Sequence, residues 1–448
     1  MQGCRGPLGA RISSAPVNAT PAHDPLDSRR NIFAFIFDIA IFVTGLAFIP
    51  SATVLVGLAG QLTEDKSLIG VAGMAFSVTW FLPQLFAARL VRNKPRQKPY
   101  ILIPSLFGRP MFLLITLWLV FTRAVNPLAT LWIMIGGIAL FNLCDALAGV
   151  AWFDVMSRTL SPRMRARVMV VGQILSGIFG LAASEVVKRV LGNPDIPFPL
   201  NYAILFASTF GCMAIATLAL LVLRETPMHH AELQEQSQSH FMADLKDAVK
   251  HDKLFRRIVV VRLLTGLEAM AASFYLVFLK ERYAFGNYVD GEMTQAIIFG
   301  GLVGVAFFGW LADRYTSRRV VHASSIMFFV TPFLAALVAA LPIPATVAYI
   351  IFIGVFLLRG ALEHSLVLGV VGYMLDSAPE RNRAMYVGAI NTLGGIVSLT
   401  PFLGGLWIDL FGHTGFNALP YMVLFSVVSA AAAAGMLISL RLPAPRRT

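Results

Sequence analysis

The stretch Gly300–Arg319, with the sequence GGLVGVAFFGWLADRYTSRR, decides the fold. It begins as an uninterrupted run of apolar residues and glycines, which ends directly before an acid–base pair, Asp313 and Arg314. Apolar residues resume at Val320, after two further arginines. A membrane-spanning helix needs about 20 mostly apolar residues. The pattern therefore predicts a helix that leaves a lipid bilayer, turns on a short charged loop and re-enters the bilayer.

The composition of the whole chain indicates an integral membrane protein. Of its 448 residues 57% are hydrophobic and 13% are charged, and the mean hydropathy is +0.72. Soluble proteins carry about 25% charged residues. The net charge of +12 does not predict nucleic-acid binding, because the bases lie in short clusters between apolar runs, where they act as orientation signals.

Motifs of enzymes and of cofactor or metal sites are missing from the sequence. It contains no phosphate-binding Gly-x4-Gly-Lys loop, no Gly-x-Ser-x-Gly elbow and no set of His and Cys at metal spacing. The three cysteines, Cys4, Cys144 and Cys212, predict neither a disulfide framework nor a metal cluster. We expect no cofactor, no metal and no enzymatic activity.

Twelve apolar segments are long enough to cross a membrane, and we expect all twelve to be helices. The apolar runs do not alternate as the strands of a membrane β-barrel do. The expected spans are 31–60, 67–90, 100–122, 127–155, 166–190, 201–223, 257–280, 293–312, 319–341, 344–374, 383–409 and 416–440. They predict an N-terminal tail (1–30), a six-helix half (31–223), a central loop (224–256), a second six-helix half (257–440) and a C-terminal tail (441–448).

The distribution of Lys and Arg predicts the orientation. With the N-terminus inside, 27 of the 36 basic residues fall in the expected cytoplasmic segments, 6 in the outer loops and 3 within spans. Because basic residues favour the cytoplasmic side, we expect a multi-pass protein of the cell membrane with both termini in the cytoplasm. The central loop becomes amphipathic from Phe241, which predicts a helix on the inner membrane surface that connects the halves.

The two expected halves repeat one sequence pattern. R-x-M-x-V-G occurs at Arg167–Gly172, where the fifth span begins, and at Arg383–Gly388, where the eleventh begins. This repeat predicts two pseudo-symmetric halves. Parallel halves related by an axis along the membrane normal are known in secondary transporters.

The loop of the opening stretch resembles the signature of the major facilitator superfamily of secondary transporters. The residues that carry the resemblance are Gly309, Asp313, Arg314, Arg318 and Arg319. The sequence departs from the family at Thr316, where a glycine is usual, and the first-half copy, Gln84–Arg89, has Ala in place of the acid. The resemblance implies a gating loop in which Asp313 latches helices together at the cytoplasmic side, and only in the second half.

Four acids within the expected spans are the best candidates for a functional site, because a charge in the bilayer interior costs at least about 2.5–3.5 kcal/mol. Asp38, Asp145, Glu268 and Glu363 lie in the first, fourth, seventh and tenth spans, which the resemblance implies line a central cavity. We expect Glu268 and Glu363, near mid-depth, to form the proton or substrate site. Asp38 and Asp145 are their counterparts nearer the cytoplasm.

Three neighbouring side chains leave alternatives open. Arg359 belongs to the candidate site, but it also precedes Glu363 by four residues, the spacing of a structural pair on one helix. His364 is either a proton relay or a polar neighbour of Glu363. Arg109, which precedes a proline, is expected to pair with Asp38 or Asp145.

These patterns predict a secondary active transporter that moves a small solute by alternating access, with proton coupling as a hypothesis that rests on the acids. The expected partners are the small-molecule substrate, protons and the lipid bilayer, with no nucleic acid and a monomeric state. The alternative is a lipid-handling or membrane assembly factor of the same fold that does not couple solute transport.

Overall fold

The computed structural model describes residues 27–81, 94–225, 250–363, 365–377, 386, 390, 393–412 and 417–443. Several expectations fall on residues outside this set. They concern most of the N-terminal tail, the end of the C-terminal tail, Gln84–Arg89, the helix from Phe241, His364 and nearly all of the second copy of the repeat.

The described part of the chain is built of helices, without strands. The helices of the first half are α1 (Arg29–Leu46), the π-helical turn η1 (Ser51–Leu55), α2 (Val56–Leu62), α3 (Lys66–Phe81), α5 (Lys98–Gly108), α6 (Met111–Thr122), α7 (Pro127–Thr159), α8 (Pro162–Gly192) and α9 (Leu200–Val222). Those of the second half are α12 (Lys253–Gly266), α13 (Glu268–Tyr283), α14 (Tyr288–Arg314), α15 (Ser317–Ala340), α16 (Ala345–Glu363), η2 (Leu366–Val371), α17 (Gly372–Ser377), α19 (Thr400–Phe411) and α20 (Ala418–Leu440).

Eleven helical segments within the described residues are long and apolar enough to cross a membrane. They match eleven of the twelve spans expected from the sequence, and the prediction of an all-α membrane protein is confirmed. The remaining span, expected at 67–90, is represented by the 16 residues of α3, since the described residues stop at Phe81.

Some of the crossing helices are interrupted inside the bundle. The third crossing breaks between α5 and α6 at Arg109 and Pro110, because proline has no N–H to continue the helical hydrogen bonds. The seventh breaks at Leu267, between α12 and α13, so that Glu268 begins a new helix in the protein interior. Both interruptions place an ionisable side chain within the span.

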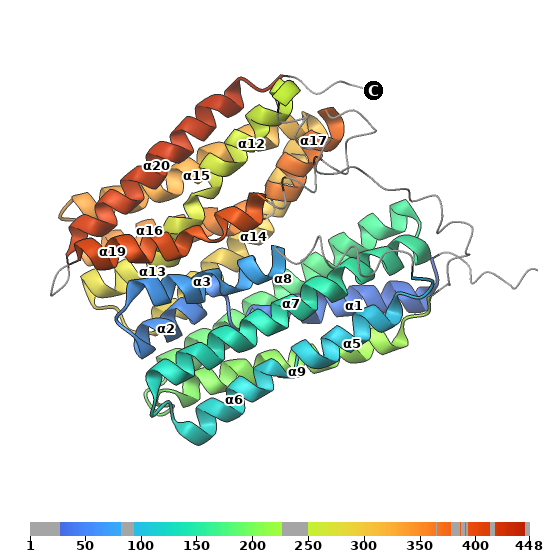
Figure 1. Ribbon diagram of the computed structural model, residues 1–448, viewed down its shortest axis with the longest axis horizontal. Coiled ribbons are helices and arrows are strands. Elements are labelled where there is room, and N and C mark those ends of the chain that lie inside the picture. Colours follow the sequence, from blue (N-terminus) through green and yellow to red (C-terminus); the bar gives the residue numbers. More distant parts are fainter. Residues whose placement is uncertain are drawn as a thin grey trace, which may run out of the picture.

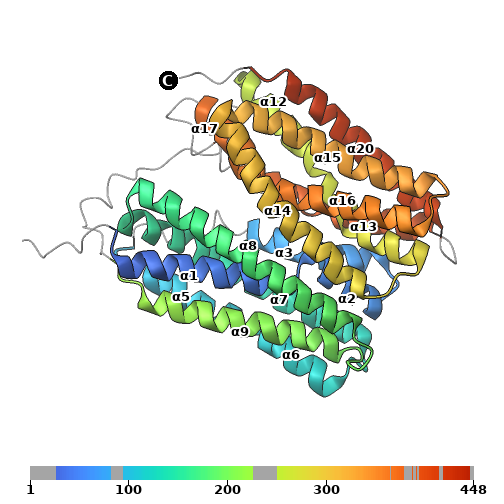
Figure 2. The ribbon, with the colours of Figure 1, turned by 180° about the vertical axis from the view of Figure 1, so that it is seen from behind.

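The helices form two bundles, residues 29–222 and residues 253–440 (Figures 1 and 2). The start of α1 and the end of α20 lie toward the right in Figure 1, where the bundles diverge. The bundles meet at the opposite end, which we call the closed end. There α8 packs against α14 and α3 packs against α19.

Small residues and polar bonds hold the closed end together. A Cβ atom on Gly405 of α19 would overlap the carbonyl oxygen of Lys66 at the start of α3, so glycine permits this close approach. The hydroxyls of Thr53 and Thr294 lie 2.7 Å apart across the two halves. The Nζ of Lys188 on α8 and the Oε1 of Glu292 on α14 lie 2.8 Å apart.

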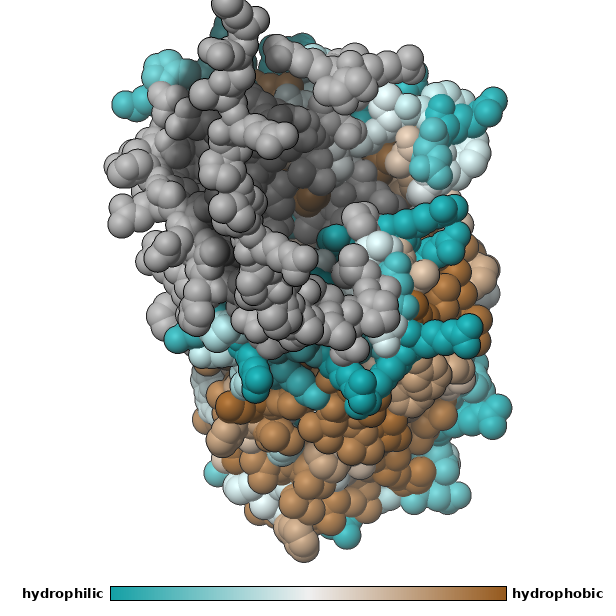
Figure 3. All heavy atoms as spheres, turned by 90° about the vertical axis from the view of Figure 1, so that its right-hand side faces the viewer, coloured by the Kyte–Doolittle hydropathy of each residue, from teal (hydrophilic) through white to brown (hydrophobic). Residues whose placement is uncertain are grey.

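The outer surface of the bundles is apolar, as a lipid-facing surface must be. Large side chains there are well exposed, with Phe121 at 79%, Ile350 at 62% and Leu410 at 62% of their full area. Hydrophobic residues cover much of the lower face in Figure 3, which belongs to the first half. Bilayer lipid would cover this surface in place of water.

Candidate functional site

The first half holds a buried ion pair between Asp38 of α1 and Arg109 at the α5–α6 break. Arg109 Nη2 lies 3.8 Å from Asp38 Oδ1, and both residues are 5% exposed. The indole N–H of Trp152 on α7 donates to Asp38 Oδ2 at 3.0 Å. Of the two partners that the sequence left open for Arg109, the ion pair therefore forms with Asp38.

Arg109 is held by further contacts from α1 and α9. Its Nη1 donates to the carbonyl oxygen of Met213 at 3.1 Å and to Thr217 Oγ1 at 2.7 Å. Its guanidinium carbon lies 5.3 Å from the ring centroid of Phe42, within the range of a cation–π contact. These contacts fix the guanidinium in one orientation.

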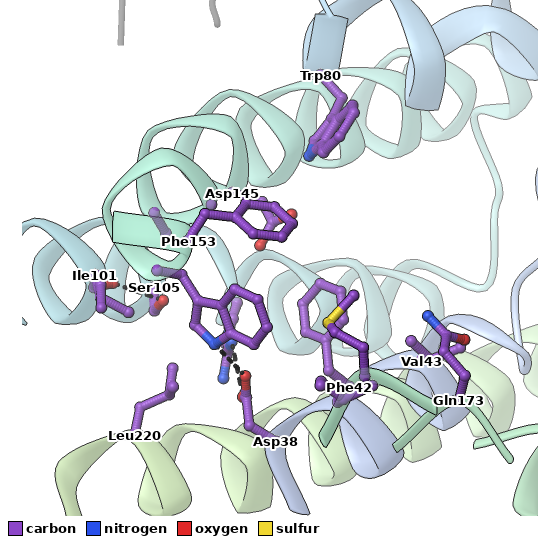
Figure 4. A pocket seen from close by; sticks show the side chains of 16 residues that line it. Asp38, Phe42, Val43, Trp80, Ile101, Ser105, Asp145, Phe153, Gln173 and Leu220 are labelled. Carbon is purple, nitrogen blue, oxygen red and sulfur yellow. Dashed lines mark hydrogen bonds and ion pairs between the residues drawn. The ribbon is translucent and has the colours of Figure 1, made fainter. Parts of the chain in front are cut away.

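Asp145 of α7 lies with this pair on the wall of a cavity of about 290 Å³ (Figure 4). Trp80 of α3 lies on the same wall. The wall is mainly apolar and aromatic. Its aromatic residues are Phe42, Trp80, Trp152 and Phe153.

The second half holds a matching cluster around Arg359 of α16. Arg359 Nε lies 3.4 Å from Glu268 Oε2, and Arg359 Nη1 lies 4.0 Å from Glu363 Oε1. Glu268 is only 2% exposed, whereas the Glu363 side chain is 53% exposed. Arg359 therefore pairs both with the acid four residues away on its own helix and with a buried acid of α13.

Glu363 reaches a second cavity, of about 390 Å³, that lies between the halves. Its walls come from α1 and α8 of the first half and α14 of the second. Val43 and Gln173 line both cavities, so the two cavities adjoin.

The structure divides the four expected acids between two places. Asp38 and Asp145 lie in the first-half cavity, while Glu268 and Glu363 flank Arg359 in the second half. Each half carries one acid on its first crossing helix and one on its fourth, since α7 and α16 are the fourth crossings.

The residues of the charged loop lie outside both cavities. Asp313 and Arg314 are exposed at the end of α14. Arg318 Nη2 donates to the carbonyl oxygen of Leu440 at 3.3 Å. Arg319 lies over the ring of Tyr315, 5.9 Å from its centroid. Gly309 has open space at its Cβ position.

Sequence reasoning missed the aromatic wall and the polar closed end. Trp152 follows Asp145 by seven residues, two helical turns, so a search for residues on the acid-bearing face of that helix would have found it. No comparable spacing in the sequence pointed to Trp80, Asp290 or Asp409. Asp290, fully buried, pairs with Lys280 at 2.9 Å.

Comparisons with solved structures show the fold of known transporters. A nucleoside transporter (NupG) superposes with a TM-score of 0.67 at 12% identity, over 92% of this chain and 99% of that chain. The inward-open xylose transporter XylE from E. coli superposes with a TM-score of 0.66 at 10% identity, over 93% of this chain and 97% of that chain. Identities this low establish the fold alone.

Curated relatives match only short segments. An arabinose-proton symporter of Bacillus subtilis is 31% identical over 75 residues, 17% of this chain and 16% of the relative. A D-xylose transporter of Levilactobacillus brevis is 29% identical over 68 residues, 15% of each chain. The matched segments thus span about a sixth of these relatives.

The family model of the Major Facilitator Superfamily, in contrast, matches residues 32–400. Because that match covers most of the chain, the protein belongs to the Major Facilitator Superfamily, a family of transporters and not of enzymes.

Proposed function

We propose that the protein is a secondary active transporter that moves a small solute by alternating access and couples this movement to protons. The observation that carries the proposal is the pair of charged clusters, one in each half, on the first and fourth crossing helices. Intramembrane ionisable residues that face a cavity mark substrate and proton pathways. The two clusters border adjoining cavities, one of which lies between the halves.

Alternating access needs two halves that can separate at either end. In this structure the halves are joined at the closed end by close packing and by polar bonds such as Lys188–Glu292, and they diverge toward the other end (Figure 1). Rocking of one half against the other would break these bonds and open the closed end to the solute.

Arg359 connects the proposed protonation of Glu363 to the packing of the helices. It lies between Glu268, which is buried, and Glu363, which is half exposed to the cavity between the halves. A proton that reaches Glu363 removes one of the two negative charges that hold the guanidinium. The guanidinium then pairs with Glu268 alone, so proton occupancy and the packing of α16 against α13 become linked.

We place the protein in the cell membrane as a monomer with both termini in the cytoplasm, on the bias of Lys and Arg toward the expected cytoplasmic segments. The closed end then faces outward, and the structure is open toward the cytoplasm. In this state Asp313 has no ion-pair partner within the described residues. The lack of a described partner for Asp313 in this state fits a latch that engages only when the cytoplasmic end closes.

Purified protein in liposomes tests the proposal. An inward proton gradient should drive accumulation or efflux of a solute found by counterflow, and dissipation of the gradient should abolish it. The variants Glu268→Gln and Glu363→Gln should lose gradient-driven transport. Unchanged rates and pH dependence in both variants would remove these acids from the mechanism. Binding of lipids alone, with no solute moved, would instead support a lipid-handling or assembly role.

A further inference from the structure

The carboxylates of the first-half cavity are unequal in their partners. Asp38 has an ion pair with Arg109 and a hydrogen bond from Trp152. Asp145 has no ion-pair partner among the described residues. The described wall of the cavity therefore holds two carboxylates and one guanidinium, and the negative charge left over is centred on Asp145.

Arg109 already has an acid as its ion-pair partner, although its buried Nε has no hydrogen-bond partner among the described residues. Its two terminal nitrogens are taken by Asp38, Thr217 and the Met213 carbonyl, and Phe42 covers one face of its guanidinium. An anionic ligand would meet the uncompensated Asp145, and among the described residues the cation on this wall, Arg109, is already paired with Asp38. The cavity therefore disfavours anions.

The cavity also offers little to a neutral, hydroxyl-rich solute. The Ser105 hydroxyl already donates to the Ile101 carbonyl at 2.7 Å, and the indole N–H of Trp152 is bonded to Asp38. Among the residues that the structure describes on the wall, Gln173 is the remaining neutral polar side chain. A site that selects a polyol must present several hydrogen-bonding groups to it.

A positively charged ligand fits all of these features. Aromatic faces attract an organic cation through their quadrupole, most strongly when the cation is desolvated. Trp80, Trp152 and Phe153 line the cavity that contains Asp145 (Figure 4). The volume of about 290 Å³ lies just below the range for small-molecule pockets, about 300–1,000 Å³, which suits an amine with one ring.

We propose that the first-half cavity binds a small organic monocation with an apolar body, whose ammonium group pairs with Asp145 and whose apolar body lies against Trp80, Trp152 and Phe153. This assignment rests on the proposed transport function, because it names the substrate class of that site. Asp38 and Arg109 are positioning residues, since their ion pair keeps the guanidinium away from the ammonium position.

Titration calorimetry on the detergent-purified full-length chain tests the assignment with four probes of similar size. Phenethylamine is a cation at pH 7, 2-phenylethanol is its neutral analogue, 3-phenylpropionate is an anion, and D-xylose represents the sugars. We expect phenethylamine to bind at least tenfold more tightly than each of the other three, a difference of about 1.4 kcal/mol or more. This comparison within the wild type depends on no variant.

Substitutions then locate the binding. Asp145→Asn keeps the side-chain shape and should weaken phenethylamine binding at least tenfold, while Asp145→Glu should restore most of it. Asp154→Asn is the matched control, because Asp154 lies on the same helix but outside the cavity, paired with Arg158. It should leave the affinity unchanged.

Several results would overturn the assignment. They are equal or tighter binding of the alcohol or of xylose, an unchanged affinity in Asp145→Asn, and binding of none of the probes.

A failure of the proposed transport function would give a different combination of results. If phenethylamine binds through Asp145 but no solute crosses a liposome membrane, transport is refuted and the cation site stands. If xylose is transported and the amine neither binds nor competes, transport stands and the cation site is refuted.

Discussion

Asp409 of α19 caps the first turn of α3 from the opposite half of the protein. Its Oδ1 accepts the backbone N–H of Lys66 at 2.9 Å, and its Oδ2 accepts that of Ser67 at 2.7 Å. The first N–H groups of a helix have no partner within the helix, and a capping side chain satisfies them. Here the cap exists only while the closed end is closed, so it stabilises one state of the proposed transport cycle.

Removal of this cap should favour opening of the closed end. Loss of a capping carboxylate costs about 1 kcal/mol, which changes a two-state equilibrium about fivefold. In Asp409→Ala we therefore expect a cysteine placed at Ser273, which is 6% exposed between the halves, to react several times faster with a membrane-impermeant maleimide. The comparison is made in the Ser273→Cys background.

Two controls separate the cap from a loss of charge. Asparagine removes the charge and keeps one acceptor oxygen, so Asp409→Asn retains one of the two N–H···O bonds and should label at a rate between those of the parent and Asp409→Ala. Glu64→Ala removes an exposed acid beside α3 and should have no effect. Equal labelling in Asp409→Ala and in the parent would show that the cap does not hold the closed end.

A second prediction concerns the close packing at Gly405. A methyl group there would overlap the Lys66 carbonyl, so Gly405→Ala must push α19 away from α3. We expect faster maleimide labelling at position 273 and weaker transport. Gly136→Ala on α7 is the matched control, because nothing lies within 4 Å of its Cβ position, and there alanine should slightly stabilise the helix. Normal labelling in Gly405→Ala would show that the halves adjust without opening.

The sequence alone predicted the spans and the helices that carry the acids, because both depend on local features. A long apolar run forms a membrane helix wherever it packs, and Asp38 or Glu268 within such a run is visible without a fold. The partners were not predictable. Lys66 and Asp409 are 343 residues apart, and their contact depends on the tilt and register of two separate bundles.

The division of the four acids into two clusters has the same physical origin. Depth along each helix could be estimated from the rise per residue, but the direction of each side chain around its helix could not. Arg109 therefore had two possible partners, and the structure pairs it with Asp38. Arg359 was expected either to pair with Glu363 or to serve the site, whereas it contacts both Glu363 and Glu268.

A third prediction compares the stabilities of two acid variants. Glu268→Gln removes the buried partner of Arg359, and loss of one member of a buried ion pair costs about 3–5 kcal/mol. Glu363→Gln removes a half-exposed partner 4.0 Å away, and such pairs contribute about 0–1 kcal/mol. Thermal unfolding in detergent should therefore give a much lower midpoint for Glu268→Gln than for Glu363→Gln.

The double variant Glu268→Gln/Arg359→Gln provides the control for this comparison. It leaves no buried charge unpaired at this point, so it should be less destabilised than the sum of its single variants. Additive effects would mean that Arg359 and Glu268 do not interact energetically, and Arg359 would then serve Glu363 alone.

The last prediction follows from a carboxylate that receives both the cation and protons. A proton on Asp145 removes the charge that attracts the ammonium group, so phenethylamine affinity should fall as the pH is lowered, and amine binding should release protons. Among the described residues, Arg109 and Asp38 are the other charged groups on the cavity wall, and they also influence the pH at which this occurs. Calorimetry in two buffers of different ionisation enthalpy measures the proton release directly.

Asp145→Asn should show weak binding that no longer varies with pH, whereas Asp154→Asn should retain the wild-type dependence. If the pH dependence survives in Asp145→Asn, the proton that competes with the amine binds to Asp38 instead. Proton–cation exchange would then depend on opening of the Asp38–Arg109 ion pair.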